Sequence, residues 1–153
     1  MDGRTVRSAR PDDYDWIIGV VDDWWGRPIA GNLPRLFLDH FHGTSFVVEV
    51  DGDPVAFLVG FVSPSQPHVG YIHFVGVHPD HRLGGTARDL YHRFFRVAVD
   101  AGCTEVHAIT GAVNERSIAF HRRMGFTASE PIDGYDGPDT SLVTFTRPVS
   151  PES

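Results

Sequence analysis

The stretch with the clearest chemical potential is a glycine-containing turn between an apolar segment and a helical one. Gly84 and Gly85 follow the apolar run that ends at Val77 and precede a long segment of helical periodicity. The first amides of a helix have no partner within the helix, its dipole favours negative charge, and glycine lets a ligand approach the backbone closely. Such a junction can bind an anion such as a phosphate. A tight turn without a ligand is the alternative.

Composition excludes several other kinds of chemistry. All 13 cationic side chains are arginines, and the chain contains no lysine. A phosphate loop ending in Gly-Lys, Schiff-base chemistry and a lysine general base are therefore excluded. The glycine spacing also differs from the G-x-G-x-x-G pattern of dinucleotide-binding folds. The formal net charge of −7 disfavours phosphate neutralisation on a large scale, so we expect no nucleic-acid partner.

Length and cysteine content indicate a single domain over residues 1–153 that needs no disulfide or metal. A chain of this length can bury a hydrophobic core of its own. The single cysteine, Cys103, cannot form an internal disulfide, and alone it cannot build a zinc site. No basic segment precedes an apolar run at the start, and no apolar stretch approaches 18 residues. We therefore expect no metal site, no membrane partner and a cytoplasmic location.

Hydrophobic periodicity places the glycine turn within an alternation of strands and helices. The predicted elements are a strand at 5–8, helices over 11–25 and 33–41, strands over 46–50, 55–62 and 69–77, a helix over 84–101, a strand over 104–110, a helix over 115–124 and a strand over 142–146. Asp51-Gly52 is a hairpin signal between two of the strands, and Phe126 marks a candidate additional strand. The order β-α-α-β-β-β-α-β-α-β predicts an α/β (α+β) fold with helices packed on a mixed sheet.

Two motifs in this order resemble the GNAT N-acetyltransferase superfamily, which binds acetyl-coenzyme A. Residues 82–87 read Arg-Leu-Gly-Gly-Thr-Ala and match the family signature R/Q-x-x-G-x-G/A, and residues 77–81 resemble the lead-in to that signature. Residues 114–126 are similar to the second family motif, N-x-x-a-i-x-f-Y-x-k-x-G-F. The order of elements matches too. The resemblance covers nearly the whole chain and implies a mostly antiparallel central sheet flanked by helices.

The resemblance implies a binding site for acetyl-CoA at the first motif. In the family, a bulge in the strand before the signature separates this strand from its neighbour, and its free backbone groups bond the pantetheine arm. These groups would belong to Val75 and Val77, with the bulge at Gly76, and the Val75 amide would polarise the thioester carbonyl. The pyrophosphate would lie on the turn formed by Arg82, Leu83, Gly84, Gly85, Thr86, Ala87 and Arg88. In the second motif, Asn114 would bond the cofactor arm, cap the following helix, or do both.

The resemblance also implies candidates for a general acid and a general base. Where the family usually has a tyrosine acid, this chain has His121. Its imidazole could protonate the departing thiolate, and it would also contact the pantetheine arm of the cofactor. The alternative is that His121 only packs on its helix. His73 lies two residues before Val75 and is expected on the same face of the strand, where it could accept the proton of the amine. It could instead be a core histidine. Tyr71 and Glu49 are further candidates.

The acceptor site of this family is usually built from the first two helices and later loops. Two carboxylates, Asp22 and Asp23, adjoin Trp24 and Trp25, and together they could hold a cationic amine. Arg27 could instead bind a carboxylate or phosphate, and Tyr71 is a further candidate contact. The alternative is that Trp24 belongs to the core and the carboxylates are solvated. The loop over residues 134–139 could close over the acceptor.

The implied reaction is direct transfer of an acetyl group from sulfur to a primary amine with both substrates bound. Positioning and oxyanion stabilisation would supply much of the acceleration. We expect a small-molecule amine as acceptor. A protein or peptide acceptor and a non-catalytic CoA sensor are the alternatives, and a homodimer is one expected state. Residues 82–123 hold seven arginines and four carboxylates, whereas the flanking segments are acidic, which suits an anionic cofactor and an amine acceptor.

Overall fold

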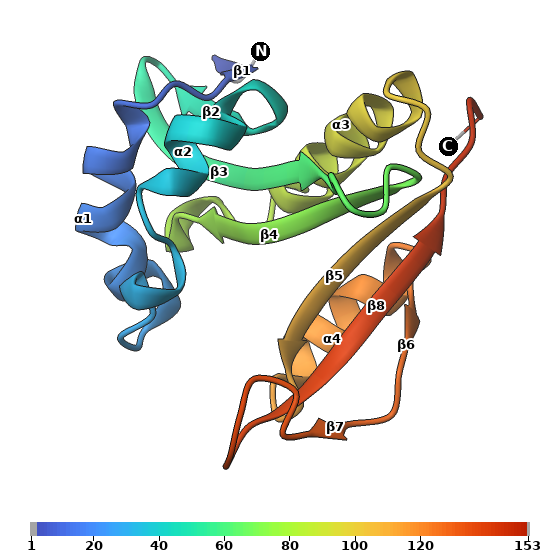
Figure 1. Ribbon diagram of the computed structural model, residues 1–153. Helices are drawn as coiled ribbons and strands as arrows, with labels where there is room; N and C mark the ends of the chain where they lie inside the picture. Colours follow the sequence, from blue (N-terminus) through green and yellow to red (C-terminus); the bar gives the residue numbers. More distant parts are fainter. Residues whose placement is uncertain (1–2, 153) are drawn as a thin grey trace.

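A twisted sheet of eight strands runs through the molecule and carries helices on both faces (Figure 1). The computed structural model describes residues 3–152. Its elements are β1 (Arg4–Ser8), α1 (Asp13–Trp25), α2 (Leu36–Phe41), β2 (Phe46–Val50), β3 (Asp53–Val62), β4 (Val69–Val77), α3 (Thr86–Asp100), β5 (Glu105–Gly111), α4 (Glu115–Arg123), β6 (Thr127–Ala128), β7 (Ile132–Asp133) and β8 (Ser141–Pro148). The predicted α/β (α+β) fold is confirmed.

The long periodic segments form the elements that the sequence predicts, and the differences concern short ones. The predicted helix over 33–41 begins only at Leu36, and a separate 3-10 turn forms at Ala30–Asn32. The candidate strand at Phe126 corresponds to β6, while β7 was not predicted. Two-residue strands are too short to show an alternating pattern. At the predicted hairpin, Asp51 and Gly52 both have positive φ, as a two-residue turn of type I′ requires.

The sheet is antiparallel except at one place, and that place divides it. The order along the sheet is β1-β2-β3-β4-β5-β8-β6, with β7 also paired to β8. The two central strands, β4 and β5, are parallel and pair only over Val69–Tyr71 with Glu105–His107. Beyond this point they diverge, so that the backbones of the two halves of the sheet form an open V (Figure 1). We call this opening the fork.

A β-bulge lies in β4 at His73. Val59 and Gly60 are consecutive in β3, yet they pair with Phe74 and Ile72, which leaves His73 as the extra residue. The bulge changes the alternation of side chains, because Ile72 belongs to the core cluster under α3 whereas Phe74 belongs to the cluster under α1 and α2. The prediction of a bulge at Gly76 is wrong. Gly76 pairs regularly with Phe57 and leaves room for its ring, since a Cβ at Gly76 would lie 2.5 Å from it.

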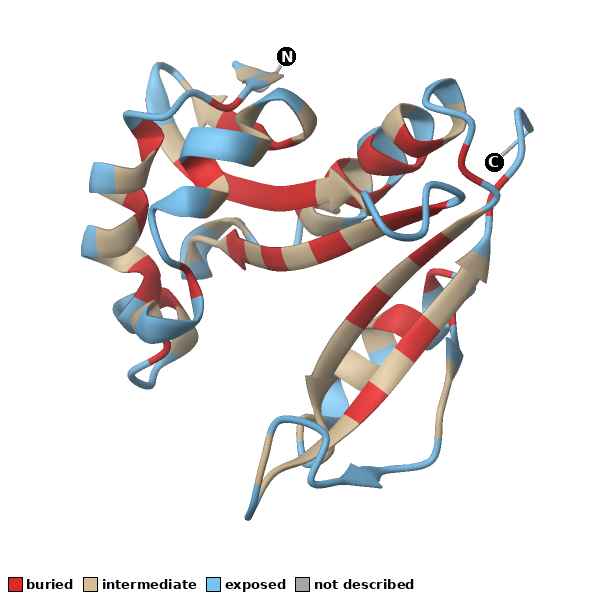
Figure 2. Ribbon diagram, viewed as in Figure 1, coloured by how far each residue is buried: buried red, intermediate tan, exposed pale blue. Residues whose placement is uncertain are grey.

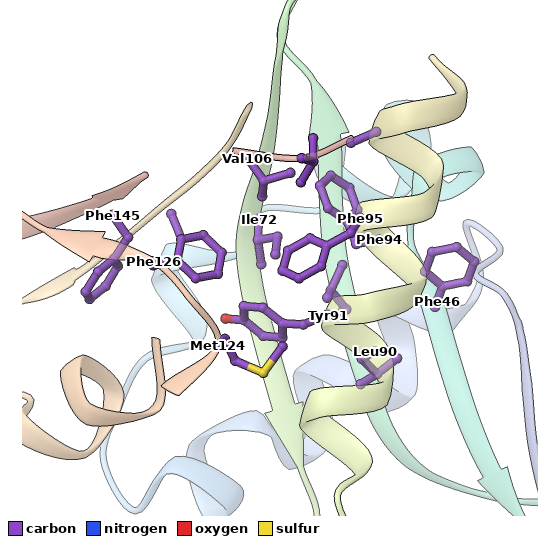
Figure 3. Packing of buried hydrophobic residues seen from close by; sticks show 14 of the residues in the cluster. Phe46, Ile72, Leu90, Tyr91, Phe94, Phe95, Val106, Met124, Phe126 and Phe145 are labelled. Carbon is purple, nitrogen blue, oxygen red and sulfur yellow. The ribbon is translucent and has the colours of Figure 1, made fainter. Parts of the chain in front are cut away.

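Two hydrophobic clusters hold the helices against the sheet, and Figure 3 shows residues of the cluster under α3 (Figures 2 and 3). On one face, the buried residues of α3 and the end of α4 pack against strands from both halves of the sheet, with Tyr91, Phe94, Phe95 and Phe145 among the large members. On the other face, α1 and α2 pack on the half made of β1 to β4. Figure 2 shows the buried and partly exposed residues alternating along β4, β5 and β8. The helices α1 and α2 thus border only one arm of the fork.

A buried carboxylate fixes the start of α1 to the sheet. Asp13 is 3% exposed and accepts hydrogen bonds from the Arg7 guanidinium, the Trp16 indole and the Arg10 amide. Burial alone would raise the pKa of Asp13, but these hydrogen bonds outweigh it and lower the pKa to about 2. Arg7 belongs to the edge strand β1, so the contact ties the start of α1 to this edge of the sheet.

Candidate active site

Backbone groups of β4 face the fork. The amide of His78 donates to the carbonyl of Val55 at 2.8 Å, which makes these two residues a hydrogen-bonded pair of the β3–β4 ladder. Pairs alternate in an antiparallel ladder, so the peptide groups of Val75 and Val77 point away from β3, toward the side on which β5 has diverged. The side chain of Val75 packs on the α3 side of the sheet. The structure therefore places the Val75 amide at the fork.

The glycine turn at the end of β4 has an open, amide-rich surface. Gly85 precedes α3 with φ +76°, a conformation that favours glycine, and the adjacent Leu83 is fully exposed. Thr86 is buried and accepts a hydrogen bond from Arg4, while the Arg88 guanidinium folds back beside Gly85. A cavity of about 260 Å³ opens at this turn and is lined partly by Arg4, Leu83, Gly84 and Thr86. The turn has the features of an anion site.

The side chain of Arg82 does not extend into this cavity. Its Nε donates to the carbonyl of Val77 at 3.1 Å, and a terminal nitrogen of the same guanidinium donates to the carbonyl of Trp24. The first residue of the glycine signature is thus engaged by the backbone of β4 and the end of α1. The expectation that Arg82 binds the cofactor is not supported by its side-chain contacts.

Asn114 caps α4, as one of the predicted alternatives states. Its side-chain oxygen accepts a hydrogen bond from the Ser117 amide at 3.2 Å, and its amide nitrogen donates to the Thr110 hydroxyl. Glu115 follows in the first turn of the helix, where an acidic side chain complements the dipole. The preceding residue, Val113, is 90% exposed, so this loop presents an apolar surface beside the start of α4.

His121 lies in the core and both of its ring nitrogens are engaged. Nδ1 lies 2.8 Å from the carbonyl of Ser117 and must donate to it, which leaves Nε2 to accept from the Tyr91 hydroxyl at 2.9 Å. The ring stacks on Phe145 with centroids 4.1 Å apart and is 5% exposed. Burial lowers the pKa of His121 to about 4. A neutral, enclosed imidazole is not suited to protonate a thiolate, so the geometry contradicts the expected acid role.

His73 reaches toward α2 instead of sharing a face with Val75. Its ring stacks on Phe37 with centroids 4.0 Å apart, and its Nε2 lies 2.8 Å from the carbonyl of Asn32. The prediction of a common face with Val75 is wrong because the bulge at His73 shifts the alternation by one residue. Nε2 carries the proton that it donates to Asn32, and in the neutral ring Nδ1 has a free lone pair. Burial lowers the pKa of His73 and favours this neutral form.

Tyr71 stands at the vertex of the fork. It stacks on Phe61 and is paired in register with His107 of β5, at the last paired position before the strands diverge. Burial, together with the charges of Tyr135 and Asp136, raises the pKa of Tyr71 to about 12, so its hydroxyl stays protonated near neutral pH. Tyr135 and Asp136 belong to the loop between β7 and β8, which precedes the end of β8 that pairs with Gly111 of β5.

The end of α1 contains both core and surface residues. Trp24 is 8% exposed and packs against Phe57 and His78, so it belongs to the core, as the alternative prediction states. Trp25 is partly exposed, packs on Phe74 of β4 and carries the Arg27 guanidinium over its ring. Asp23 is exposed. Of the predicted acceptor contacts at this end, Asp23, Trp25 and Arg27 remain on the surface beside β4.

Comparison with known proteins identifies the family to which this fold and these motifs belong. A model of the acetyltransferase (GNAT) family matches residues 8–126, which include both motifs and the fork. The chain belongs to the GNAT family. Its enzymes are acetyltransferases, and acetyl-CoA is the acyl donor.

Individual GNAT proteins resemble the chain over most of its length. An acetyltransferase of Pectobacterium atrosepticum is 28% identical over 126 residues, which cover 79% of this chain and 86% of that protein. The ribosomal-protein-S18-alanine N-acetyltransferase of Escherichia coli has the same fold, with a TM-score of 0.77, 18% identity and coverage of 96% and 94%. Diaminobutyrate acetyltransferase of Paenibacillus lautus, solved with its substrate and coenzyme A, has a TM-score of 0.71, 19% identity and coverage of 95% of each chain.

The GNAT site of this chain fits acetyl-CoA in its backbone geometry. The fork offers the Val75 amide and the unpaired side of β4, and the glycine turn offers amides and Arg88 to a diphosphate. Sequence reasoning missed two contributors. Asn32 orients His73 through its backbone carbonyl, and Phe37 stacks on the ring. A backbone carbonyl leaves no signal in the side-chain pattern. The aromatic side chain of Phe37, in the predicted second helix, is a signal that could have indicated a stacking partner.

Residues 3–152 provide neither a cluster of metal ligands nor a membrane-spanning helix. No group of three or more His, Cys, Asp or Glu side chains in this range is arranged to hold a metal ion. No helix in the same range combines the length and apolar character that crossing a bilayer demands.

Proposed function

We propose that this protein transfers the acetyl group of acetyl-CoA to the primary amine of a small molecule by direct attack, with both substrates bound at the fork. The observation that carries the proposal is the divergence of β4 and β5, which leaves the Val75 amide facing the gap. An amide in that position can donate to the carbonyl oxygen of a thioester as negative charge develops on it. Acetyl-CoA supplies the activated acyl group.

In this proposal the phosphates of acetyl-CoA lie on the glycine turn, and its pantetheine group passes between β4 and β5. Leu83, Gly84, Gly85, Thr86, Ala87 and Arg88 form the turn, and the backbone of Val75 and Val77 lines the gap. Gly76 contributes through its regular pairing, which keeps β4 extended here. The free Nδ1 of His73 accepts the proton of the attacking amine, directly or through a water molecule, while Nε2 stays bonded to Asn32. As the new C–N bond forms, the C–S bond of acetyl-CoA breaks, and the released CoA thiolate takes its proton from water.

The charged and aromatic side chains of the acceptor side support a small molecule that carries an amine and a second polar group. Tyr71 and His73 lie on the face bordered by α2 and the turn at Ala30–Asn32, and the charge of Asp136 in the loop between β7 and β8 acts on the Tyr71 hydroxyl. Asp136 and the aromatic rings suit a cationic amine, and Asp23, Trp25 and Arg27 offer contacts for a second group such as a carboxylate.

The test is thiol release from acetyl-CoA across matched acceptors. We expect turnover with diamines or amino acids that carry a side-chain amine, and kcat/KM at least about tenfold lower with peptides that present the same amine, since excluding the rest of the peptide costs binding energy. Preference for peptides would reassign the acceptor to the protein class. Binding of acetyl-CoA without turnover of any amine would indicate a sensor. A homodimer and a cytoplasmic location stay predictions.

A further inference from the structure

We propose that Arg82 is a positioning residue that holds the acceptor side of the site, including His73, in place relative to the glycine turn. The inference rests on the proposed function for the role of His73. Arg82 is the first residue of the glycine signature, yet its guanidinium is bonded to backbone carbonyls of two other elements. Three consecutive sets of hydrogen bonds lead from it to the imidazole.

The first set closes the end of α1. Trp24 lies in the last turn of α1, where carbonyls lack partners within the helix and the dipole is negative. A cation that donates to such a carbonyl is well placed. Because Arg82 also donates to Val77, the same guanidinium joins the end of α1 to the end of β4. This link lies directly beside the turn that would bind the phosphates.

The second set joins α1 to the segment that follows it. The carboxylate of Asp22 accepts hydrogen bonds from the amides of Ile29 and Ala30 at 2.8 and 2.9 Å. Its backbone carbonyl accepts from Gly26 and Arg27. The last turn of α1 and the loop that leads to the 3-10 turn are therefore one hydrogen-bonded unit.

The third set reaches the imidazole. The 3-10 turn at Ala30–Asn32 is closed by a bond from the Asn32 amide to the Ile29 carbonyl, and the Asn32 carbonyl accepts from Nε2 of His73. Displacement of α1 at its end would move Asn32 and with it the proton-accepting Nδ1. Small displacements of a catalytic group are costly because proton transfer depends on its distance and direction to the amine.

Substitution of Arg82 should therefore disturb the acceptor side more than the cofactor side. In Arg82→Ala we expect amide exchange over residues 26–33 of the free protein to accelerate about tenfold, the effect of losing a charged hydrogen bond. The kcat/KM for the amine should fall by about tenfold to 100-fold through misplacement of His73. The dissociation constant of acetyl-CoA, from calorimetry, should stay within about threefold of the wild type, a change of less than one net hydrogen bond. Arg82→Lys, which can donate to one carbonyl, should recover part of the loss.

Arg88 provides the matched control, since it is an arginine of the same turn with its guanidinium beside Gly85. Arg88→Ala should weaken acetyl-CoA binding about tenfold, as expected for a lost contact to a phosphate, and leave exchange over residues 26–33 unchanged. If Arg82→Ala behaves like Arg88→Ala, Arg82 is a phosphate ligand and the proposal is overturned.

Two measurements keep this test independent of folding and of the proposed reaction. If Arg82→Ala does not fold, Asp22→Ala removes the second link instead and should accelerate exchange over residues 29–33 with Arg82 in place; unchanged exchange would overturn the proposal. Amide exchange and acetyl-CoA binding need no amine. Absence of turnover in the wild type would therefore remove the proposed function and His73 as base, while the positional role of Arg82 would still be decided.

Discussion

The chemistry proposed for His73 depends on one backbone contact. The Asn32 carbonyl can only accept, so it fixes the proton of the imidazole on Nε2 and leaves Nδ1 as the basic atom. The stack on Phe37 holds the plane of the ring. Burial lowers the pKa of His73 below its ordinary value of 6.5, so the base is unprotonated at neutral pH. Orientation and charge state are thus set by the same packing.

Replacement of His73 by glutamine tests the base. A glutamine amide can still donate to the Asn32 carbonyl, but it has no basic nitrogen. We expect kcat to fall about 100-fold, within the range for loss of a general base. In the wild type the acidic limb of kcat/KM should lie below pH 6.5, because a lowered pKa keeps the base neutral to lower pH.

Stopped-flow or steady-state thiol release over pH 4.5–9 measures this limb. It should disappear in His73→Gln, while the limb that belongs to protonation of the amine substrate stays. An unchanged profile and kcat in the variant would eliminate His73 as base.

Replacement of His121 by phenylalanine tests a structural role in place of the acid role. His121 is neutral when folded with a pKa of about 4, against 6.5 when unfolded. The unfolded state binds the additional proton between these values, so stability is fully present above pH 6.5 and is lost as pH falls toward 4, by about 3 kcal/mol. His121→Phe keeps the stack on Phe145 and should reduce this pH dependence.

Urea unfolding at pH 7.5 and 4.5 measures the difference. The free energy of unfolding should decline less in the variant over this range, although the variant is less stable at pH 7.5 because Tyr91 loses its acceptor. The pH profile of turnover should keep both limbs. A lost limb would restore His121 as the acid.

At this scale the sequence locates residues better than it assigns their roles. The motif singles out His121, but a motif does not show that both ring nitrogens are bonded inside the core, and this bonding speaks against the acid role. Trp24 could be placed at the end of a helix, but only packing against Phe57 and His78 separates it from the exposed Trp25. Whether a side chain is buried depends on the residues that pack against it from other elements, and these are distant in the sequence.

Strands and helices with sustained periodicity could be predicted almost residue by residue, and β4 was predicted with its observed bounds. The internal irregularity of β4 could not. A single extra residue at His73 exchanges the faces of all residues on one side of it, and the Ile72-His73-Phe74 run is equally compatible with regular alternation. The consequence was an incorrect shared face for His73 and Val75.

The glycine turn before α3 offers a prediction with an internal control. Gly85 has φ +76°, and a Cβ there would also meet the Arg88 guanidinium at 3.2 Å, whereas Gly84 has open space around it. Gly85→Ala should cost about 1 kcal/mol or more of stability through backbone strain and should weaken acetyl-CoA binding, because the amides are reoriented. Gly84→Ala should change stability by less than about 0.5 kcal/mol.

Chemical denaturation without ligand, followed by calorimetric titration with acetyl-CoA, measures both effects. Equal destabilisation by the two alanines would show that the positive φ of Gly85 is not what the turn requires.

For the whole molecule, the order of elements and the two motifs were sufficient to predict the fold. The sequence predicts the strongly amphipathic helix α3 and the apolar strand β3 without ambiguity. β3 lies inside the sheet, and α3 packs on one face of it. The arginine-rich segment, residues 82–123, covers the first motif and most of the second, which is consistent with an anionic cofactor there. The acceptor surface was harder, since it is assembled from α1, α2, β4 and the loop between β7 and β8.

Acetyl-CoA should raise the melting temperature of the whole chain. A ligand at 100 times its dissociation constant stabilises the native state by about 2.7 kcal/mol, which corresponds to roughly 5–10 °C for a domain of this size. Differential scanning fluorimetry measures the shift. Pantetheine, which lacks the diphosphate that the glycine turn would bind, should give a smaller one, and a flat response to acetyl-CoA would contradict the assigned cofactor site.

The fork also bears on how the molecule unfolds. Only three residue pairs, Val69–Tyr71 with Glu105–His107, join the two halves of the sheet along β4 and β5, and α3 with its core cluster supplies most of the remaining connection. The pantetheine group of acetyl-CoA, bound between β4 and β5, would supply hydrogen bonds where the two strands do not pair with each other. Binding of the donor substrate would then strengthen the coupling that the α3 cluster provides between the two halves, so the cooperativity of unfolding, and not only its midpoint, should depend on the acyl donor.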